Sequence, residues 1–252
     1  MHRFFVDHEQ IMDGRVRFRE DQARQLRNVL RLRPGDFVTI LDNSGEACHV
    51  RLEQVTREQA DGRIEARFAA SGEPSVRLTL YQSLLNREKF EWVLQKGTEL
   101  GVARFAPVIT RRTLVRSAGE DKLARWRRIL IEAAEQSGRG RLPELLAPIS
   151  FEEALRRSKS DARSLIAWEK AGGPGVTPAL AGLSAGAAIA LHIGPEGGYD
   201  EEEILAARPA GAVVVSLGPR ILRTETAAVV ATSIVMHVLG ELGELEQVDR
   251  ES

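Results

Sequence analysis

The stretches HIGPEGGY (residues 192–199) and SLGPRILRTETA (residues 216–227) decide how this chain is interpreted. Each follows an apolar run and precedes a helical pattern, so each predicts a strand that ends in a tight turn before a helix. In a parallel sheet, the crevice beyond the carboxyl ends of the strands is the usual ligand site. Glycines in such turns let the backbone approach a ligand closely. We therefore expect both turns to surround a ligand, although either turn alone is also compatible with ordinary strand-to-helix glycines.

The two turns lack the spacing of the common phosphate-binding loops. A P-loop requires GxxxxGK[ST], and a dinucleotide-binding turn requires GxGxxG with an acidic residue about twenty positions later. Neither pattern occurs around these turns. Glu196 instead places a carboxylate in the first turn with no lysine beside it. This chemistry suits a cationic or zwitterionic ligand better than a nucleoside polyphosphate.

The chain after residue 75 alternates between predicted strands and helices. The expected strands are 76–80, 105–109, 165–168, 188–193 and 213–216. The expected helices are 88–100 and 121–137, with two more that begin at Asp200 and Thr224. At the start of the helix from Asp200, Asp200 and Glu203 have the spacing of a capping box. Such alternation predicts an α/β fold with a mostly parallel sheet covered on both faces.

The first 70 residues predict a smaller, β-rich domain. Phe37–Leu41 and Cys48–Leu52 flank the turn cluster Asp42–Gly45, which indicates a hairpin. A short helical pattern over 21–32 precedes it, and the breaker-rich residues 71–75 are typical of a linker. The expected domains are 1–72 and 73–252.

Composition narrows the class of protein. With 252 residues, 43% of them apolar and 28% charged, the chain is of ordinary globular type. The single cysteine, Cys48, excludes a disulfide framework, and together with an N-terminus that lacks a signal peptide it favours the cytoplasm. Five scattered histidines offer no metal-ligand spacing, so we expect no metal. The near-apolar stretch 227–239 is too short to span a bilayer, so we expect no membrane association.

The charges are segregated along the chain although the net charge is only −1. Residues 15–33 carry seven arginines against two acids, and residues 111–141 carry nine basic residues against four acids, which leaves +5 in each segment. Basic patches on a neutral protein are typical of a polyanion-binding face. Taken alone, either basic segment could instead be the solvent-exposed face of a helix that binds no polyanion.

The two turns, together with EKFEWVLQKGTELGV (88–102) and RWRRILIEAAEQSGR (125–139), resemble the RsmE family of SPOUT-superfamily methyltransferases. RFFV (3–6) and VLRLRPGD (29–36) resemble the RNA-binding domain of that family. The resemblance implies methylation of N3 of a uridine in 16S ribosomal RNA with S-adenosylmethionine as cofactor. It further implies a PUA-like β-barrel over 1–72, a trefoil-knotted methyltransferase domain over 73–252, and a homodimer with the methyl-donor site beside the partner subunit.

The resemblance also assigns roles to individual residues. The cofactor would be bound by Gly194, Glu196, Gly197, Gly198, Leu217, Gly218, Ile221, Leu222, Thr226 and Ala227. Catalysis would involve Arg223, Glu225 and Glu99, and RNA would be held by Arg3, Arg24, Arg31, Arg33, Arg111, Arg112 and Arg139. The loop Thr110-Arg111-Arg112-Thr113 departs from the family pattern but stays basic.

The chemistry of uridine explains why charged residues are expected at this site. N3 is a weak nucleophile until its proton leaves, so the site needs a base or a cation that stabilises the developing anion. Arg223 can stabilise that anion, and Glu225 can orient Arg223 or receive the proton; their alternative is an ion pair that complements a helix dipole. Lys89, Lys96 and Glu99 share a helix face, and a Lys96–Glu99 ion pair is the alternative to a place at the substrate pocket.

Two other functions remain compatible with the sequence. A related knotted methyltransferase acting on a ribose 2′-oxygen or another base would use the same cofactor turns. A non-catalytic RNA-binding factor of ribosome assembly could keep the fold without the chemistry, although the intact glycines and arginines of both turns argue against it.

Overall fold

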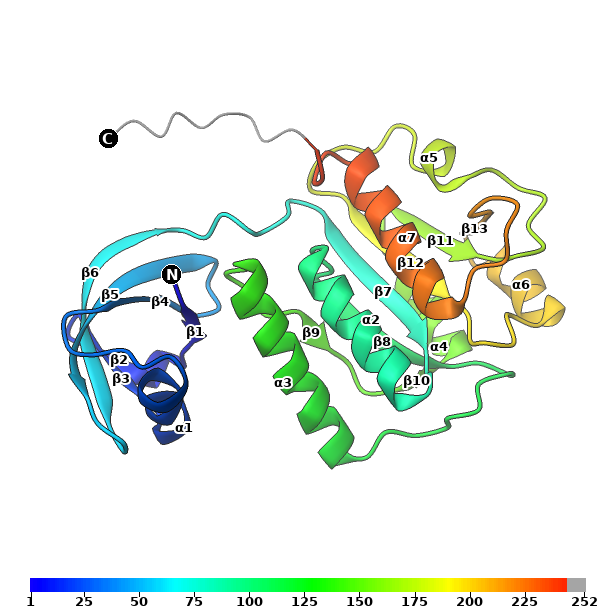
Figure 1. Cartoon of the computed structure of the whole chain (residues 1–252). Coiled ribbons are helices and arrows are strands. Elements are labelled where there is room, and N and C mark those ends of the chain that lie inside the picture. Colours follow the sequence, from blue (N-terminus) through cyan, green and yellow to red (C-terminus); the bar gives the residue numbers. More distant parts are fainter. Residues whose placement is uncertain (244–252) are drawn as a thin grey trace. The chain divides into compact units, whose positions relative to one another are not determined.

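The computed structural model describes residues 1–243, which form two compact units (Figure 1). The first unit comprises Met1–Glu73 and Ile131–Leu142, and the second comprises Pro74–Leu130 together with the chain from Pro143 onward. Residues 131–142 fall within the expected domain 73–252, yet they lie in the first unit.

The first unit is built on one curled sheet of six strands in the order β1-β4-β5-β6-β3-β2 (Figure 1). Its strands are β1 (Arg3–Phe5), β2 (Ile11–Met12), β3 (Arg15–Phe18), β4 (Phe37–Leu41), β5 (Glu46–Val55) and β6 (Ala60–Ala69). The predicted hairpin is confirmed, since β4 and β5 pair antiparallel around a turn in which Asn43 and Gly45 both have positive φ. Phe4, Leu26 and Ile40 are buried in the core of the sheet.

The helix predicted over 21–32 is shorter than expected. It consists of α1 (Glu20–Arg24), which continues as one π-helical turn (Gln25–Val29). Arg31 then adopts φ +57°, a left-handed conformation that ends the helix.

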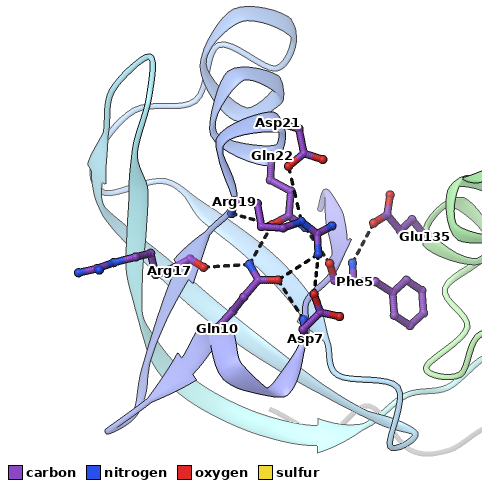
Figure 2. Close-up of polar contacts among 8 residues, drawn as sticks. All are labelled: Phe5, Asp7, Gln10, Arg17, Arg19, Asp21, Gln22 and Glu135. Carbon is purple, nitrogen blue, oxygen red and sulfur yellow. Dashed lines mark hydrogen bonds and ion pairs between the residues drawn. The ribbon is translucent and has the colours of Figure 1, made fainter.

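The last turns of α3 (Glu120–Ser137) pack within the first unit. Ala134 is buried with Phe5 and Leu41. The Phe5 N–H donates a hydrogen bond of 2.8 Å to the Glu135 carboxylate, while Gln22 Nε2 donates to the Phe5 carbonyl at 2.7 Å (Figure 2). Burial raises the pKa of Glu135 to about 7, against the opposing effect of the Phe5 N–H. A half-buried carboxyl therefore secures the first strand.

The second unit is a parallel sheet in the order β10-β8-β7-β12-β11-β13, with β9 beside β8. The strands are β7 (Arg77–Ser83), β8 (Arg104–Ile109), β9 (Glu144–Leu145), β10 (Ile149–Ser150), β11 (Arg163–Ala167), β12 (Ala188–Ile193) and β13 (Ala212–Val215). The helices, besides α3, are α2 (Arg87–Glu99), α4 (Phe151–Ser158), α5 (Val176–Ala179), α6 (Glu201–Ala207) and α7 (Thr224–Val238). The predicted parallel α/β architecture is confirmed, whereas β9, β10, α4 and α5 were not anticipated.

Helices cover both faces of this sheet because successive strand residues point to opposite sides. On β7, Leu80 joins the core under α2, α7 and the first part of α3, whereas Tyr81 joins the core under α4 and α6 (Figure 1). Trp126 of α3 is fully buried against Phe90 of α2, with ring centroids 4.3 Å apart. Helices are thus packed against both faces of the sheet whose strand ends form the cavity.

Candidate active site

Three neighbouring strands of the second unit end at the same level. β11 lies between β12 and β13, and Ala167 pairs with both Ile193 and Val215 at the carboxyl edge. The three loops that leave this edge, with the starts of α2 and α7, enclose a cavity of about 450 Å³. Both glycine turns therefore meet in one crevice beyond the strand ends, where parallel sheets bind ligands.

The first turn follows β12 and depends on its last glycine. The N–H of Gly198 donates to the Pro195 carbonyl at 2.9 Å, and Gly198 has φ +66°. A Cβ atom at Gly198 would lie 2.8 Å from a carboxylate oxygen of Glu169. Glycine is needed here both for the backbone conformation and for the space beside Glu169.

The second turn follows β13 and leads into α7. Gly218 has φ +103°, and its N–H donates to the Ser216 hydroxyl at 3.2 Å. Thr224, the first residue of α7, donates from its hydroxyl to the Gly194 carbonyl at 2.5 Å and accepts from Gln82 Nε2 at 3.2 Å. The buried Thr224 hydroxyl thus joins the two turns to each other and to β7.

Most residues expected at the cofactor do line this cavity. They are Gly194, Glu196, Gly197, Gly198, Leu217, Gly218, Ile221, Leu222 and Ala227, accompanied by Arg223 and Glu225. Thr226 and Glu99 are not among the lining residues. Glu99 forms an ion pair of 2.8 Å with Lys96 on α2, which is the alternative that its spacing allowed. The structure therefore favours the ion-pair alternative for Glu99 over a place at this cavity.

Charged side chains of both signs gather at the cavity wall. Lys89 of α2 places its Nζ 3.4 Å from Glu196 Oε1 and 3.8 Å from Glu225 Oε2. Arg223 is exposed, precedes α7 and makes no ion pair within residues 1–243. Its guanidinium is therefore available to a ligand, whereas the two carboxylates share one ammonium group.

Sequence reasoning missed the part of the cavity that follows β11. Trp168 and Glu169 line it, as do Lys89 and Arg220. The rule that ligands bind beyond strand ends could have pointed to Trp168 and Glu169, since 165–168 was itself a predicted strand. The missing information was that this strand lies between the two that carry the glycine turns.

The basic loop at residues 110–113 supports the first turn. Arg112 donates to the Gly197 carbonyl at 3.0 Å and to the Asp200 carboxylate at 2.9 Å. Arg111 pairs with Glu202, and its backbone N–H donates to Glu203 at 2.9 Å. Both arginines, expected to hold RNA, are thus engaged with the start of α6. The predicted Asp200–Glu203 capping box at that helix is confirmed.

The arginines expected to hold RNA in the first unit differ in their surroundings. Arg31 and Arg33 are exposed, Arg24 pairs with Glu20, and Arg3 donates to the carbonyls at the end of α3. Arg139 is only 3% exposed and pairs with Glu73 at 3.2 Å. This burial favours a structural role for Arg139 over contact with RNA.

His192, although part of the first motif, is not among the residues that line the cavity. Its ring is fully buried, stacks on Tyr81 with centroids 4.5 Å apart and lies 3.3 Å from the Ser164 hydroxyl. Burial lowers the pKa of His192 to about 3, so the ring is neutral at physiological pH. Its role is packing between strands.

Two family models match separate parts of the chain. The RNA methyltransferase domain family matches residues 72–236, and the RNA methyltransferase PUA domain family matches residues 18–65. The ribosomal RNA small subunit methyltransferase E of Synechocystis sp. is 34% identical over 94% of this chain and 78% of its own length. The protein of the same name from Bacillus subtilis is 30% identical over 86% of this chain and 88% of its own.

Solved structures show the same relationship. The ribosomal RNA small subunit methyltransferase E of Neisseria gonorrhoeae, bound to S-adenosyl methionine, superposes with a TM-score of 0.85 at 35% identity, over 96% of this chain and all (100%) of its own. A putative methyltransferase of Legionella pneumophila, in complex with the same cofactor, gives a TM-score of 0.83 at 31% identity, over 93% and 96% of the two chains. The chain therefore belongs to the ribosomal RNA small subunit methyltransferase E family and is an S-adenosylmethionine-dependent methyltransferase.

Proposed function

We propose that this protein transfers a methyl group from S-adenosylmethionine to N3 of a uridine in the 16S RNA of the small ribosomal subunit. The observation that carries the proposal is the cavity in which both glycine turns meet with Arg223 and Glu225. The small-subunit context rests on the names of the relatives, and the uridine position rests on the family resemblance and on the charges at the site.

The residues of the cavity fit the proposed cofactor. S-adenosylmethionine carries a sulfonium and an ammonium group, and Glu196 and Glu169 supply carboxylates to the wall. Leu217, Leu222 and Ala227 offer apolar surface for the adenine ring. The glycine turns present backbone N–H and C=O groups without side chains in the way. When bound, the cofactor would supply an electrophilic methyl group on its sulfonium sulfur, and transfer of that group would leave the sulfur as a neutral thioether.

Arg223 and Glu225 would activate the uridine. Loss of the N3 proton places negative charge on the ring and its two carbonyl oxygens, and a guanidinium can donate to those oxygens. Glu225, whose side chain is 16% exposed, is oriented by the first turn of α7 and can accept the proton. Transfer is then an in-line displacement, in which the protein mainly aligns N3 with the methyl group and excludes water.

The first unit would hold the RNA. Arg31 and Arg33 are exposed just after the helical turn that ends at Val29, and such cations bind phosphates without reading sequence. Because N3 takes part in base pairing, the target uridine must leave its stack before transfer, so we expect a flipped base. RNA binding should accordingly depend strongly on salt.

We also propose a homodimer and the trefoil knot of SPOUT proteins. One side of α7 is buried in the core through Ala231 and Val235, whereas Val229, Val230 and Ile234 remain partly exposed. A second copy of the chain would cover the partly exposed side that carries Val229, Val230 and Ile234. Light scattering measures the assembly state, and a monomeric mass would exclude the dimer.

Within residues 1–243, no helix is long and apolar enough to cross a bilayer.

Nucleoside mass spectrometry of small-subunit RNA from cells with and without the gene tests the reaction. Loss of N3-methyluridine alone is the expected result. Loss of a ribose methyl group or of another methylated base would instead identify a related methyltransferase. Thermal stabilisation by S-adenosylhomocysteine separates either enzyme from a non-catalytic assembly factor, which would show no shift.

The role of Arg223 can be tested separately. Arg223→Ala should lower kcat by about 10²–10³-fold, as removal of one stabilising donor does at other anionic transition states. Affinity for S-adenosylhomocysteine should change little. Arg208→Ala, at an exposed arginine that ends α6, is the matched control. Equal activity of the two variants would remove Arg223 from the mechanism.

A further inference from the structure

Lys89 occupies a position that helix electrostatics do not explain. It is the third residue of α2, which begins at Arg87 after the cap Asn86. A cation in the first turn of a helix faces the positive end of the helix dipole, which is unfavourable. Yet the Lys89 side chain is only 35% exposed and lines the cavity. Its surroundings must therefore account for its position.

Two carboxylates from distant parts of the chain surround the Lys89 ammonium. Glu196 belongs to the first glycine turn, at 3.4 Å, and Glu225 belongs to the start of α7, at 3.8 Å. Glu225 Oε2 is buried and accepts no hydrogen bond among the residues that the structure describes. Without a cation between them, the two carboxylates would repel each other across the cavity wall.

We propose that Lys89 is a positioning residue for methyl transfer, which holds the Glu225 carboxylate at the cavity wall and ties it to the first glycine turn through Glu196. This inference rests on the proposed role of Glu225 as proton acceptor. Lys89 acts through Glu225 on the transfer step. Removal of its charge should therefore affect turnover more than cofactor binding.

Lys96 provides a matched control on the same helix. Its side chain is also 35% exposed and also pairs with a carboxylate, that of Glu99 at 2.8 Å, but neither residue lines the cavity. Lys96→Met thus removes one lysine–carboxylate pair from α2 without touching the site. Ion pairs of this exposure usually contribute little to stability, so both variants should fold.

The experiment measures transfer of labelled methyl groups from S-adenosylmethionine into small-subunit RNA. Lys89→Met should lower kcat about ten- to a hundredfold, a part of the ~10²–10⁴-fold that a positioned proton acceptor contributes. The dissociation constant of S-adenosylhomocysteine should stay within about threefold of the wild-type value, since the interaction lost acts in turnover. Lys89→Arg should restore most of the activity, and Lys96→Met should match the wild type.

A double-variant comparison shows whether Lys89 acts through Glu225. If it does, Lys89→Met combined with Glu225→Gln should be no slower than Glu225→Gln alone. Additive losses would overturn the proposal, and so would equal activity of Lys89→Met and Lys96→Met. A loss confined to S-adenosylhomocysteine affinity would assign Lys89 to the cofactor instead and would also overturn it.

The outcome is separable from that of the proposed function. Labelled methyl groups are counted in RNA whichever atom they reach, so a product other than N3-methyluridine would refute the uridine assignment and leave the Lys89 result standing. Conversely, N3-methyluridine formed at an unchanged rate by Lys89→Met would refute the role of Lys89 alone. A wild-type protein that transfers no methyl group would overturn both.

Discussion

Replacing Glu135 by glutamine should stabilise the first unit at neutral and alkaline pH. Glu135, near the end of α3, accepts a hydrogen bond of 2.8 Å from the Phe5 N–H of β1. Burial raises its pKa from 4.5 to about 7. Glutamine keeps an oxygen of similar placement for the Phe5 N–H and has no charge to desolvate.

The size of the effect follows from the pKa difference. Between pH 4.5 and about 7 the folded protein holds the Glu135 proton while the unfolded chain has lost it. The unfolding free energy therefore falls as the pH rises through this window and levels off above it. At about 1.36 kcal/mol per pH unit, the fall amounts to at most about 3 kcal/mol. The unfolding free energy of Glu135→Gln should not fall over this pH range. It should equal that of the wild type near pH 4.5, where the Glu135 carboxyl of the folded protein is protonated.

Hydrogen exchange measured peptide by peptide is the suitable assay. All tryptophans and tyrosines of the chain lie in the second unit, so intrinsic fluorescence would not report on the first. Exchange protection of the peptide that carries β1 should decrease from pH 5 to pH 8 in the wild type, after correction for intrinsic exchange, and stay level in Glu135→Gln. Glu58→Gln, at an exposed carboxylate between β5 and β6, serves as control and should follow the wild type.

If the exchange protection of the β1 peptide changed with pH in the same way in the wild type and in Glu135→Gln, this reasoning would be refuted. It would mean that the carboxyl is ionised in the folded protein throughout the window, and that water reaches it more freely than its burial indicates. Lower protection of Glu135→Gln at every pH would instead mean that the amide cannot replace the carboxylate as acceptor for Phe5.

Two further changes test the site and the division of labour between the units. Gly198→Ala should weaken S-adenosylhomocysteine binding about tenfold by calorimetry, because the left-handed φ disfavours alanine and its methyl group would meet Glu169 at 2.8 Å. Gly211→Ala carries similar backbone strain at φ +92° with nothing within 4 Å, and an equal loss of affinity there would refute the cavity argument. Charge reversal at Arg31 and Arg33 should weaken RNA binding and reduce the salt slope by about one to two, while cofactor affinity stays unchanged. If cofactor affinity falls equally, the two units do not divide the work as proposed.

Local patterns predicted much of the fold because strands, turns and helix starts depend on near neighbours in the chain. The alternation after residue 75, the hairpin around Asn43 and the capping box at Asp200 all match the structure. Segments with weak periodicity were missed. β9 and β10 have two residues each, too few for an alternating pattern to be recognised.

The sequence by itself determined that two glycine turns lie at the carboxyl edge of a parallel sheet, since strand, glycine and helix follow one another within a few residues. Only the tertiary structure decided that β11 lies between β12 and β13, which brings Trp168 and Glu169 to the cavity. It also decided that Lys89 meets a carboxylate 107 positions away. Strand order and long-range ion pairs depend on how the whole core packs, and no local pattern records that choice.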